Sequence, residues 1–184
     1  MAASGTSEGP LPANAPQSAE LRTAGAHDLE AINTVIDRAV MGWDLPERVK
    51  RLALPLYRYN DYDLRVMQFR VAEIPGGGIL GVAAWEDADP RDLPAPQGEA
   101  ANRARHGVLL HGLYIDPAQQ RSGLGTRLLA AVGDAARATG ARWLLVKAQN
   151  GAEGFFERRG LVRLPVRDTD RDYEGRYLLD LHAA

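Results

Sequence analysis

The stretch Leu113–Arg127, LYIDPAQQRSGLGTR, decides how the rest of the chain is interpreted. Its apolar start predicts a strand that ends at Asp116-Pro117, because proline lacks an amide donor and restricts the residue before it. Helical spacing of apolar residues then predicts a helix over about 123–139, with Gly140 ending it. The stretch therefore predicts a strand, a glycine-rich turn and a helix in succession.

Such a turn is suited to bind an anion. The first amides of a helix lack intrahelical acceptors and lie at the positive end of the helix dipole. Gly123 and Gly125 have no side chain, which lets a phosphate approach these amides closely. The P-loop pattern needs a Lys followed by Ser or Thr, and the dinucleotide-binding pattern needs a third glycine. A nucleotide-phosphate-binding α/β module is therefore the less favoured alternative, and tight helix–strand packing is a purely structural explanation of the same glycines.

The bulk composition fits one folded domain over residues 19–184, preceded by a flexible Ala/Pro/Ser-rich tail over 1–18. The chain has 184 residues, of which 45% are hydrophobic and 25% charged, and its net charge of −2 gives no case for a nucleic-acid partner. The absence of cysteine excludes disulfides and thiolate catalysis, and the histidines show no metal-ligand spacing. We find no membrane-spanning run and no secretory signal, so we expect a cytoplasmic protein without a membrane partner.

Apolar periodicity predicts the remaining elements. A second helix is expected after Asp44 as N-cap, with Val49, Leu52, Ala53 and Leu56 as its apolar side. The other expected elements are a strand near 20–23, a helix over about 29–43, a hairpin of strands 65–74 and 79–85, a surface loop over 87–105, a buried strand over 143–148, a short helix over 152–159, and strands near 161–165 and 176–182.

Three motifs resemble the GNAT superfamily of N-acetyltransferases. Gln120–Gly125, QRSGLG, is similar to the family's Gln/Arg-x-x-Gly-x-Gly/Ala signature, and Leu113–Pro117 resembles the end of its fourth strand. Phe155–Leu161, FFERRGL, is similar to the family's Phe-Tyr-Glu-Lys-x-Gly-Phe stretch. The resemblance implies an α/β (α+β) fold, a mixed central sheet of about seven strands flanked by helices. It also implies that strands four and five splay apart around acetyl-CoA, the co-substrate.

The resemblance implies where acetyl-CoA is held. The pyrophosphate would meet backbone amides of 121–125, and the pantetheine would pair along 113–115, which is sensible because splayed strands leave unpaired edge groups. Asn150 or Gln149, which falls in the family's register, would bond the pantetheine arm. The implied cofactor-binding residues are Leu113, Tyr114, Ile115, Gln120, Arg121, Ser122, Gly123, Leu124, Gly125, Thr126, Asn150 and Phe156.

The chemistry implied is direct transfer of acetyl to a primary amine in a ternary complex, which needs a base for the amine and donors for the oxyanion. His111 is the favoured base, since imidazoles titrate in the useful range, although a packed structural histidine is an even alternative. Glu86 is the rival base, acting through water, and a solvated charge is its simpler explanation.

The acid departs from the family pattern, because the usual tyrosine position is occupied by Phe156, which cannot donate a proton. Tyr173, Tyr114 and Tyr177 are candidate acids, or the thiolate leaves unprotonated. A non-catalytic acyl-CoA-binding or regulatory domain of the same fold is the alternative function.

An acceptor wall is expected from the region of the two early helices. Its aromatic and acidic side chains would suit a cationic amine. We expect a small-molecule or peptide amine as acceptor, and dimers are common in the family, so a homodimer remains open. The residues expected at this wall are Trp43, Tyr57, Tyr59, Asp61, Tyr62 and Asp63.

Overall fold

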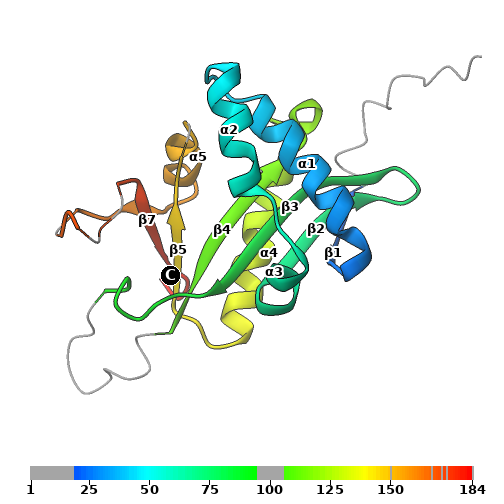
Figure 1. Ribbon diagram of the computed structural model, residues 1–184. Coiled ribbons are helices and arrows are strands. Elements are labelled where there is room, and N and C mark those ends of the chain that lie inside the picture. The colour runs from blue at the N-terminus through cyan, green and yellow to red at the C-terminus, as the bar shows by residue number, and fades with distance from the viewer. Residues whose placement is uncertain are drawn as a thin grey trace, which may run out of the picture.

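A seven-stranded mixed sheet with helices on both faces makes up the domain in the computed structural model (Figure 1). The strand order is β1-β2-β3-β4-β5-β7-β6, and the β4–β5 pair is parallel. This confirms the predicted fold class. No helix in the described part of the chain is long and apolar enough to cross a membrane. The structure describes residues 19–94, 106–149, 151–166, 168–170, 172 and 174–183.

The element bounds agree with most of the expected ones. The expected tail over 1–18 and part of the expected loop, 95–105, lie outside the described residues. The strands are β1 (Glu20–Thr23), β2 (Gln68–Ile74), β3 (Gly78–Asp87), β4 (Gly107–Ile115), β5 (Trp143–Lys147), β6 (Val162–Arg163) and β7 (Arg176–Asp180). The helices are α1 (Leu29–Met41), α2 (Glu47–Tyr57), α3 (Asp61–Val66), α4 (Leu124–Ala138) and α5 (Glu153–Glu157), with short 3-10 helices η1 (Ala26–Asp28) and η3 (Pro117–Gln119).

Helix α3 was not expected: residues 61–64 were given no helix, and its last two residues, Arg65 and Val66, were expected to begin a strand. Asn60 caps it: the Asn60 side-chain oxygen accepts from the amide of Tyr62 at 2.8 Å. The carboxylate of Asp63 accepts in return from the Asn60 amide at 2.8 Å, which completes a capping box. The strand therefore begins at Gln68.

Two apolar cores lie on opposite faces of the sheet (Figure 1). The α4 core joins one face of α4 to alternate residues of the strands, including Trp85 and Leu110. The α1 core joins α1 to the other face, including Val82 and Tyr114. Burying each large aliphatic side chain contributes roughly 1.5–3 kcal/mol, so these two cores fix which way the strands present their side chains. A third, smaller cluster contains Ala88, Leu93, Leu145 and Leu178.

The predicted orientation of α2 is wrong. Its expected apolar residues Val49, Leu52 and Leu56 are 46%, 70% and 84% exposed. Lys50 is buried instead, because its ammonium donates to the carbonyl oxygen of Met41 at 2.8 Å, at the end of α1. The helix instead packs Leu54 and Tyr57 against the α1 core, and Lys50 also pairs with Glu47 at 2.5 Å. The N-cap position is held by Pro46, and Asp44 makes no capping contact there.

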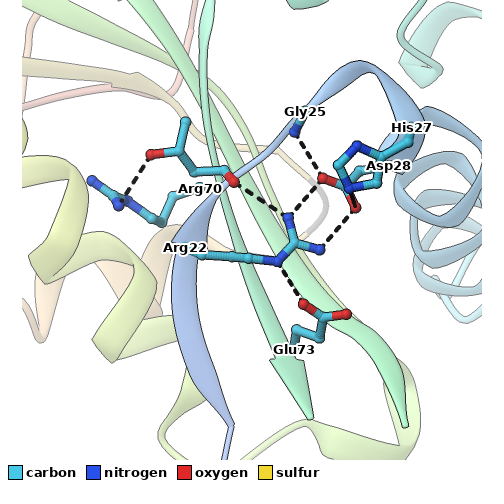
Figure 2. A network of polar contacts seen from close by, with 7 residues as sticks. Arg22, Gly25, His27, Asp28, Arg70 and Glu73 are labelled. Atoms are coloured by element: carbon cyan, nitrogen blue, oxygen red, sulfur yellow. Dashed lines mark hydrogen bonds and ion pairs between the residues drawn. The ribbon is translucent and has the colours of Figure 1, made fainter. Parts of the chain in front are cut away.

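The start of α1 is fastened to the edge of the sheet by an arginine-centred network (Figure 2). The guanidinium of Arg22 on β1 donates to both carboxylate oxygens of buried Asp28, at 2.7 and 2.8 Å, and to Glu73 on β2 at 2.5 Å. The Asp28 carboxylate also accepts from the amide of Gly25 at 2.7 Å. The hydrogen bonds from Arg22 lower the pKa of Asp28 to about 2.

Candidate functional site

The β4 and β5 strands pair over only half of β4. Their register runs from Gly107 opposite Trp143 to Leu110 opposite Val146, and β4 then continues to Ile115. On its other side β4 stays paired with β3 to its end. The β4 edge from residue 111 to residue 115 therefore has no β5 partner in the described part of the chain. This agrees with the splay that the family resemblance implies.

The side chains of the unpaired edge alternate between the two cores. Leu113 and Ile115 pack against the α4 core, and Tyr114 is buried in the α1 core. The side chains of these three residues pack into the cores. Their backbone amides and carbonyls are therefore the groups that can bind a ligand along the edge.

Asp116 leads the chain out of β4 into the turn. Its carboxylate accepts from the amide of Ala118 at 2.9 Å and from the guanidinium of Arg38 on α1 at 2.9 Å. Proline at the next position forms the first residue of η3. The end of β4 is thereby joined to helix α1, which covers the α1 core.

The glycine-rich turn contains two residues with left-handed backbone. Arg121 has φ 62°, which is unusual for a residue with a side chain, and Gly123 has φ 86°. The hydroxyl of Ser122 donates to the carbonyl oxygen of Gln119 at 2.6 Å and stabilises the turn. Successive left- and right-handed residues turn their amides toward a common point, which is an anion-binding arrangement.

The helix N-terminus adds further free amides. The amide of Arg127 donates to the carbonyl of Gly123 at 3.1 Å and is the first to close a helical turn, so the amides of residues 124–126 precede it. Leu124 is buried, while Gln120 and Arg121 are exposed. A Cβ on Gly123 would meet nothing within 4 Å. The space beside the amides is therefore open where the predicted phosphate would sit.

His111 is the extra residue of a β-bulge. Ala84 and Trp85 are adjacent on β3, yet their partners on β4 are Gly112 and Leu110. His111 lies between these two partners and is unpaired with β3, and such a bulge re-aims the side chain of the extra residue. The hydrophobic pattern of β4 gives no sign of this bulge, so sequence reasoning missed it.

The bulge brings His111 to Glu86. Trp85 is buried in the α4 core, so strand alternation directs Glu86 to the opposite face. There its Oε1 lies 2.7 Å from Nε2 of His111. The two side chains are 33% and 39% exposed, which leaves them accessible from solvent. The residues that the sequence offered as rival bases thus form one pair.

Comparison with known proteins finds similarity to acetyltransferases. An acetyltransferase (GNAT) domain model matches residues 97–172. Similar structures include a GNAT family acetyltransferase from Brucella melitensis in complex with acetyl-CoA, at 18% identity and TM-score 0.57, covering 88% of this chain and 87% of that one. PaiA N-acetyltransferase from Thermoplasma acidophilum, in complex with coenzyme A, has 14% identity and TM-score 0.66 over 88% of this chain and 96% of that one. No curated protein sequence gives a match. Residues 97–172 are therefore similar to a GNAT acetyltransferase domain, and the chain has the fold of these GNAT acetyltransferase structures.

The position that carries a tyrosine in much of the GNAT superfamily is a core position here. Phe156 is only 5% exposed, and its ring lies 6.5 Å from that of Tyr177. Its neighbour Phe155 is half-buried and would lie 3.6 Å from a Cβ on Gly125, beside the turn. Phe155 therefore presents its ring nearer to the glycine-rich turn. The predicted cofactor contact of Phe156 remains a prediction.

The candidate acids differ in access. The Tyr177 hydroxyl donates to Glu157 at 3.1 Å, and the residue is buried. Burial also raises the pKa values of Tyr114 and Tyr59, which makes both phenols poorer proton donors. Tyr173 and Asn150, two of the predicted site residues, lie outside the described residues.

The expected acceptor wall is partly assembled. The rings of Trp43 and Tyr57 meet edge to face at 5.0 Å, and Tyr59 packs against the α1 core. The Tyr57 hydroxyl donates to Oε1 of Gln149 at 2.9 Å, which links the end of α2 to the residue beyond β5. Tyr62, by contrast, is 62% exposed on α3.

The two acidic residues expected at the acceptor wall lie at the start of α3. Asp63 belongs to the capping box, and Asp61 is exposed. The structure therefore gathers the aromatic part of the expected wall, while Asp63 serves the helix that the sequence analysis missed.

Proposed function

We propose that this GNAT domain transfers an acetyl group from acetyl-CoA directly to a primary amine in a ternary complex, with His111 as general base. The observation that carries the proposal is the unpaired edge of β4, which leads into an anion-binding turn at the start of α4. The match of residues 97–172 to an acetyltransferase (GNAT) domain model supports the same reaction. Two similar GNAT structures contain acetyl-CoA or coenzyme A, which supports the choice of cofactor.

The residues present fit acetyl-CoA. Its extended pantetheine arm carries amides that match an unpaired strand edge, and residues 113–115 offer such an edge. Its pyrophosphate carries negative charge, and residues 121–125 offer free amides, a positive helix end and open space beside Gly123. Of the two predicted amide contacts, Gln149 lies among the described residues, just beyond β5, where its Oε1 accepts from the Tyr57 hydroxyl.

The proposed reaction needs no covalent enzyme intermediate. The lone pair of the neutral amine attacks the thioester carbonyl, a C–N bond forms and the C–S bond breaks. The proton lost by the amine goes to His111, and the thiolate of coenzyme A leaves and takes a proton from water. A neutral amine is required for attack, so a base at hydrogen-bonding reach of the amine accelerates the reaction. Holding both substrates together supplies much of the remaining acceleration.

The cofactor assignment is tested by thermal unfolding with acetyl-CoA, coenzyme A or ATP. A ligand at one hundred times its dissociation constant adds about 2.7 kcal/mol of stability. For a domain of this size this corresponds to a rise of about 5–10 °C in the midpoint. We expect that rise with acetyl-CoA and coenzyme A, and little with ATP. An equal rise with ATP would favour the nucleotide-binding alternative.

The transfer itself is tested by release of coenzyme A in the presence of an amine panel of alkylamines, amino acids and short peptides. A thiol-reactive chromophore detects the product, and the chain contributes no background because it has no cysteine. We expect release that depends on one amine class and an N-acetyl product by mass spectrometry.

Tight binding of acetyl-CoA without amine-dependent release across the panel would instead support the non-catalytic acyl-CoA-binding domain. That alternative is motivated by Phe156 at the position where the family usually has tyrosine. The two experiments together therefore separate a transferase from a binding domain.

A further inference from the structure

We propose that Glu86 is a positioning residue that holds His111 by its Nε2 atom, so that Nδ1 takes the proton from the acceptor amine. The inference rests on the proposed acetyl transfer and adds which imidazole atom acts and what fixes it. It replaces the two independent bases considered from the sequence by one pair.

The geometry that carries the proposal comes from the bulge. Glu86 is the register partner of Leu109, and His111 lies two residues further along β4. Side chains at this diagonal share a face of an antiparallel pair and come within reach of each other. The extra residue in β4 allows His111 to reach this position, and its Nε2 lies 2.7 Å from Oε1 of Glu86.

The chemistry of the two groups assigns the proton. An ionised carboxylate only accepts hydrogen bonds, so the Nε2 atom that contacts it carries the hydrogen. A neutral imidazole has one donor and one acceptor nitrogen, which leaves the lone pair on Nδ1 free. The amine proton therefore moves to Nδ1, and the resulting imidazolium, paired with the carboxylate, later releases it to water.

The pair is matched to the roles of base and positioning group. Among model compounds an imidazole is a stronger base than a carboxylate, so the histidine is the better acceptor of the amine proton. Both side chains remain about a third exposed, at 33% and 39%, so the amine can approach the imidazole. On β4, His111 lies between Leu109, which packs against the small third cluster, and Gly112, which lies beside the α1 core.

The chain offers a matched control beside the pair. Asp87 follows Glu86 on β3, and its Oδ1 lies 3.5 Å from Nε2 of His106. Asp87→Asn removes the same charge one residue away, from a carboxylate that is 86% exposed and contacts a different histidine. A loss of kcat that reflects only the net charge at this end of β3 would appear in both Glu86→Gln and Asp87→Asn.

The test is a double-mutant cycle of His111→Ala and Glu86→Gln, with kcat measured on an alkylamine and on a weakly basic arylamine. We expect Glu86→Gln to lower kcat for the alkylamine about tenfold, within the 10²–10⁴-fold that general-base catalysis supplies. The arylamine is already neutral, so its kcat should change by less than about twofold. In the His111→Ala background Glu86→Gln should add no further loss, because Glu86 acts only through His111.

Three outcomes would overturn the proposal: losses that multiply in the double variant, a loss in Glu86→Gln that Asp87→Asn shares, or an unchanged kcat in Glu86→Gln. The thermal shift with acetyl-CoA must be retained in every variant, which separates a lost base from a lost fold. If the parent itself shows no amine-dependent turnover, the proposed function fails, and the pair is tested separately by ¹⁵N NMR. The His111 ring, assigned by loss of its signals in His111→Ala, should carry its hydrogen on Nε2, and a hydrogen on Nδ1 overturns the proposal.

Discussion

Substituting Gly123 tests the predicted phosphate site against a nearly identical position elsewhere on the same helix. Gly123 precedes α4 with φ 86°, and Gly140 follows it with φ 82°. At both positions an added Cβ would meet nothing within 4 Å. Alanine at either position therefore introduces the same backbone strain without a clash, and only the ligand distinguishes them.

The magnitude follows from the backbone and from linkage. A residue with a side chain in left-handed conformation costs about 1–2 kcal/mol, so both variants should unfold about 2–8 °C below the parent. A Cβ beside the turn amides of Gly123→Ala should weaken acetyl-CoA binding at least tenfold. At a concentration one hundred times the parent's dissociation constant, the stabilisation by ligand then falls from about 2.7 to about 1.4 kcal/mol.

The assay is thermal unfolding of the parent, Gly123→Ala and Gly140→Ala, each with and without acetyl-CoA, with dissociation constants checked by calorimetry. We expect equal losses of stability without ligand, and a reduced ligand shift in Gly123→Ala alone. A full ligand shift in Gly123→Ala, or an equal reduction in Gly140→Ala, would refute the assignment of the turn as the pyrophosphate site.

Three further predictions concern the framework around the site. Asp28, whose pKa is lowered from 3.8 to about 2 by Arg22, contributes about 2 kcal/mol above pH 4 that is lost as the pH falls through 2. The gap in stability between the parent and Asp28→Asn, measured by denaturant unfolding, should therefore narrow from pH 5 to about pH 2, and a constant gap would contradict this. Gly112→Ala would place a Cβ against the ring of Tyr114 and 2.6 Å from the Tyr59 hydroxyl, and should lower stability by about 1–3 kcal/mol, whereas an unchanged midpoint would mean that both rings move aside freely. Leu52→Gln, at a side chain 70% exposed, should change the free energy of unfolding by less than about 0.5 kcal/mol. A larger loss would mean that Leu52 is buried, as the periodicity of α2 predicted.

The helices and strands near the site could be predicted because their signals are local. The apolar spacing of α4 and the run of β5 report burial directly, and β4 ends where Asp116-Pro117 requires it to end. The glycines of the turn were predicted from their lack of a side chain, and the structure adds that Gly123 adopts the left-handed backbone that glycine adopts readily. Helix α3 was not predicted because its start signal, the capping box, spans only Asn60–Asp63. The longer apolar alternation that follows it indicated a strand.

The sequence by itself determined the order of the strands and of every helix of the sheet layers except α3, the glycine-rich turn and the family resemblance, because turn chemistry and apolar periodicity act over a few neighbouring residues. Only the tertiary structure decided the face of α2, since burial of Lys50 depends on a carbonyl at the end of a different helix. Only the tertiary structure paired His111 with Glu86, 25 residues apart in the chain. The register between two strands, including one extra residue in β4, sets that contact, and strand register is determined by packing across the whole sheet.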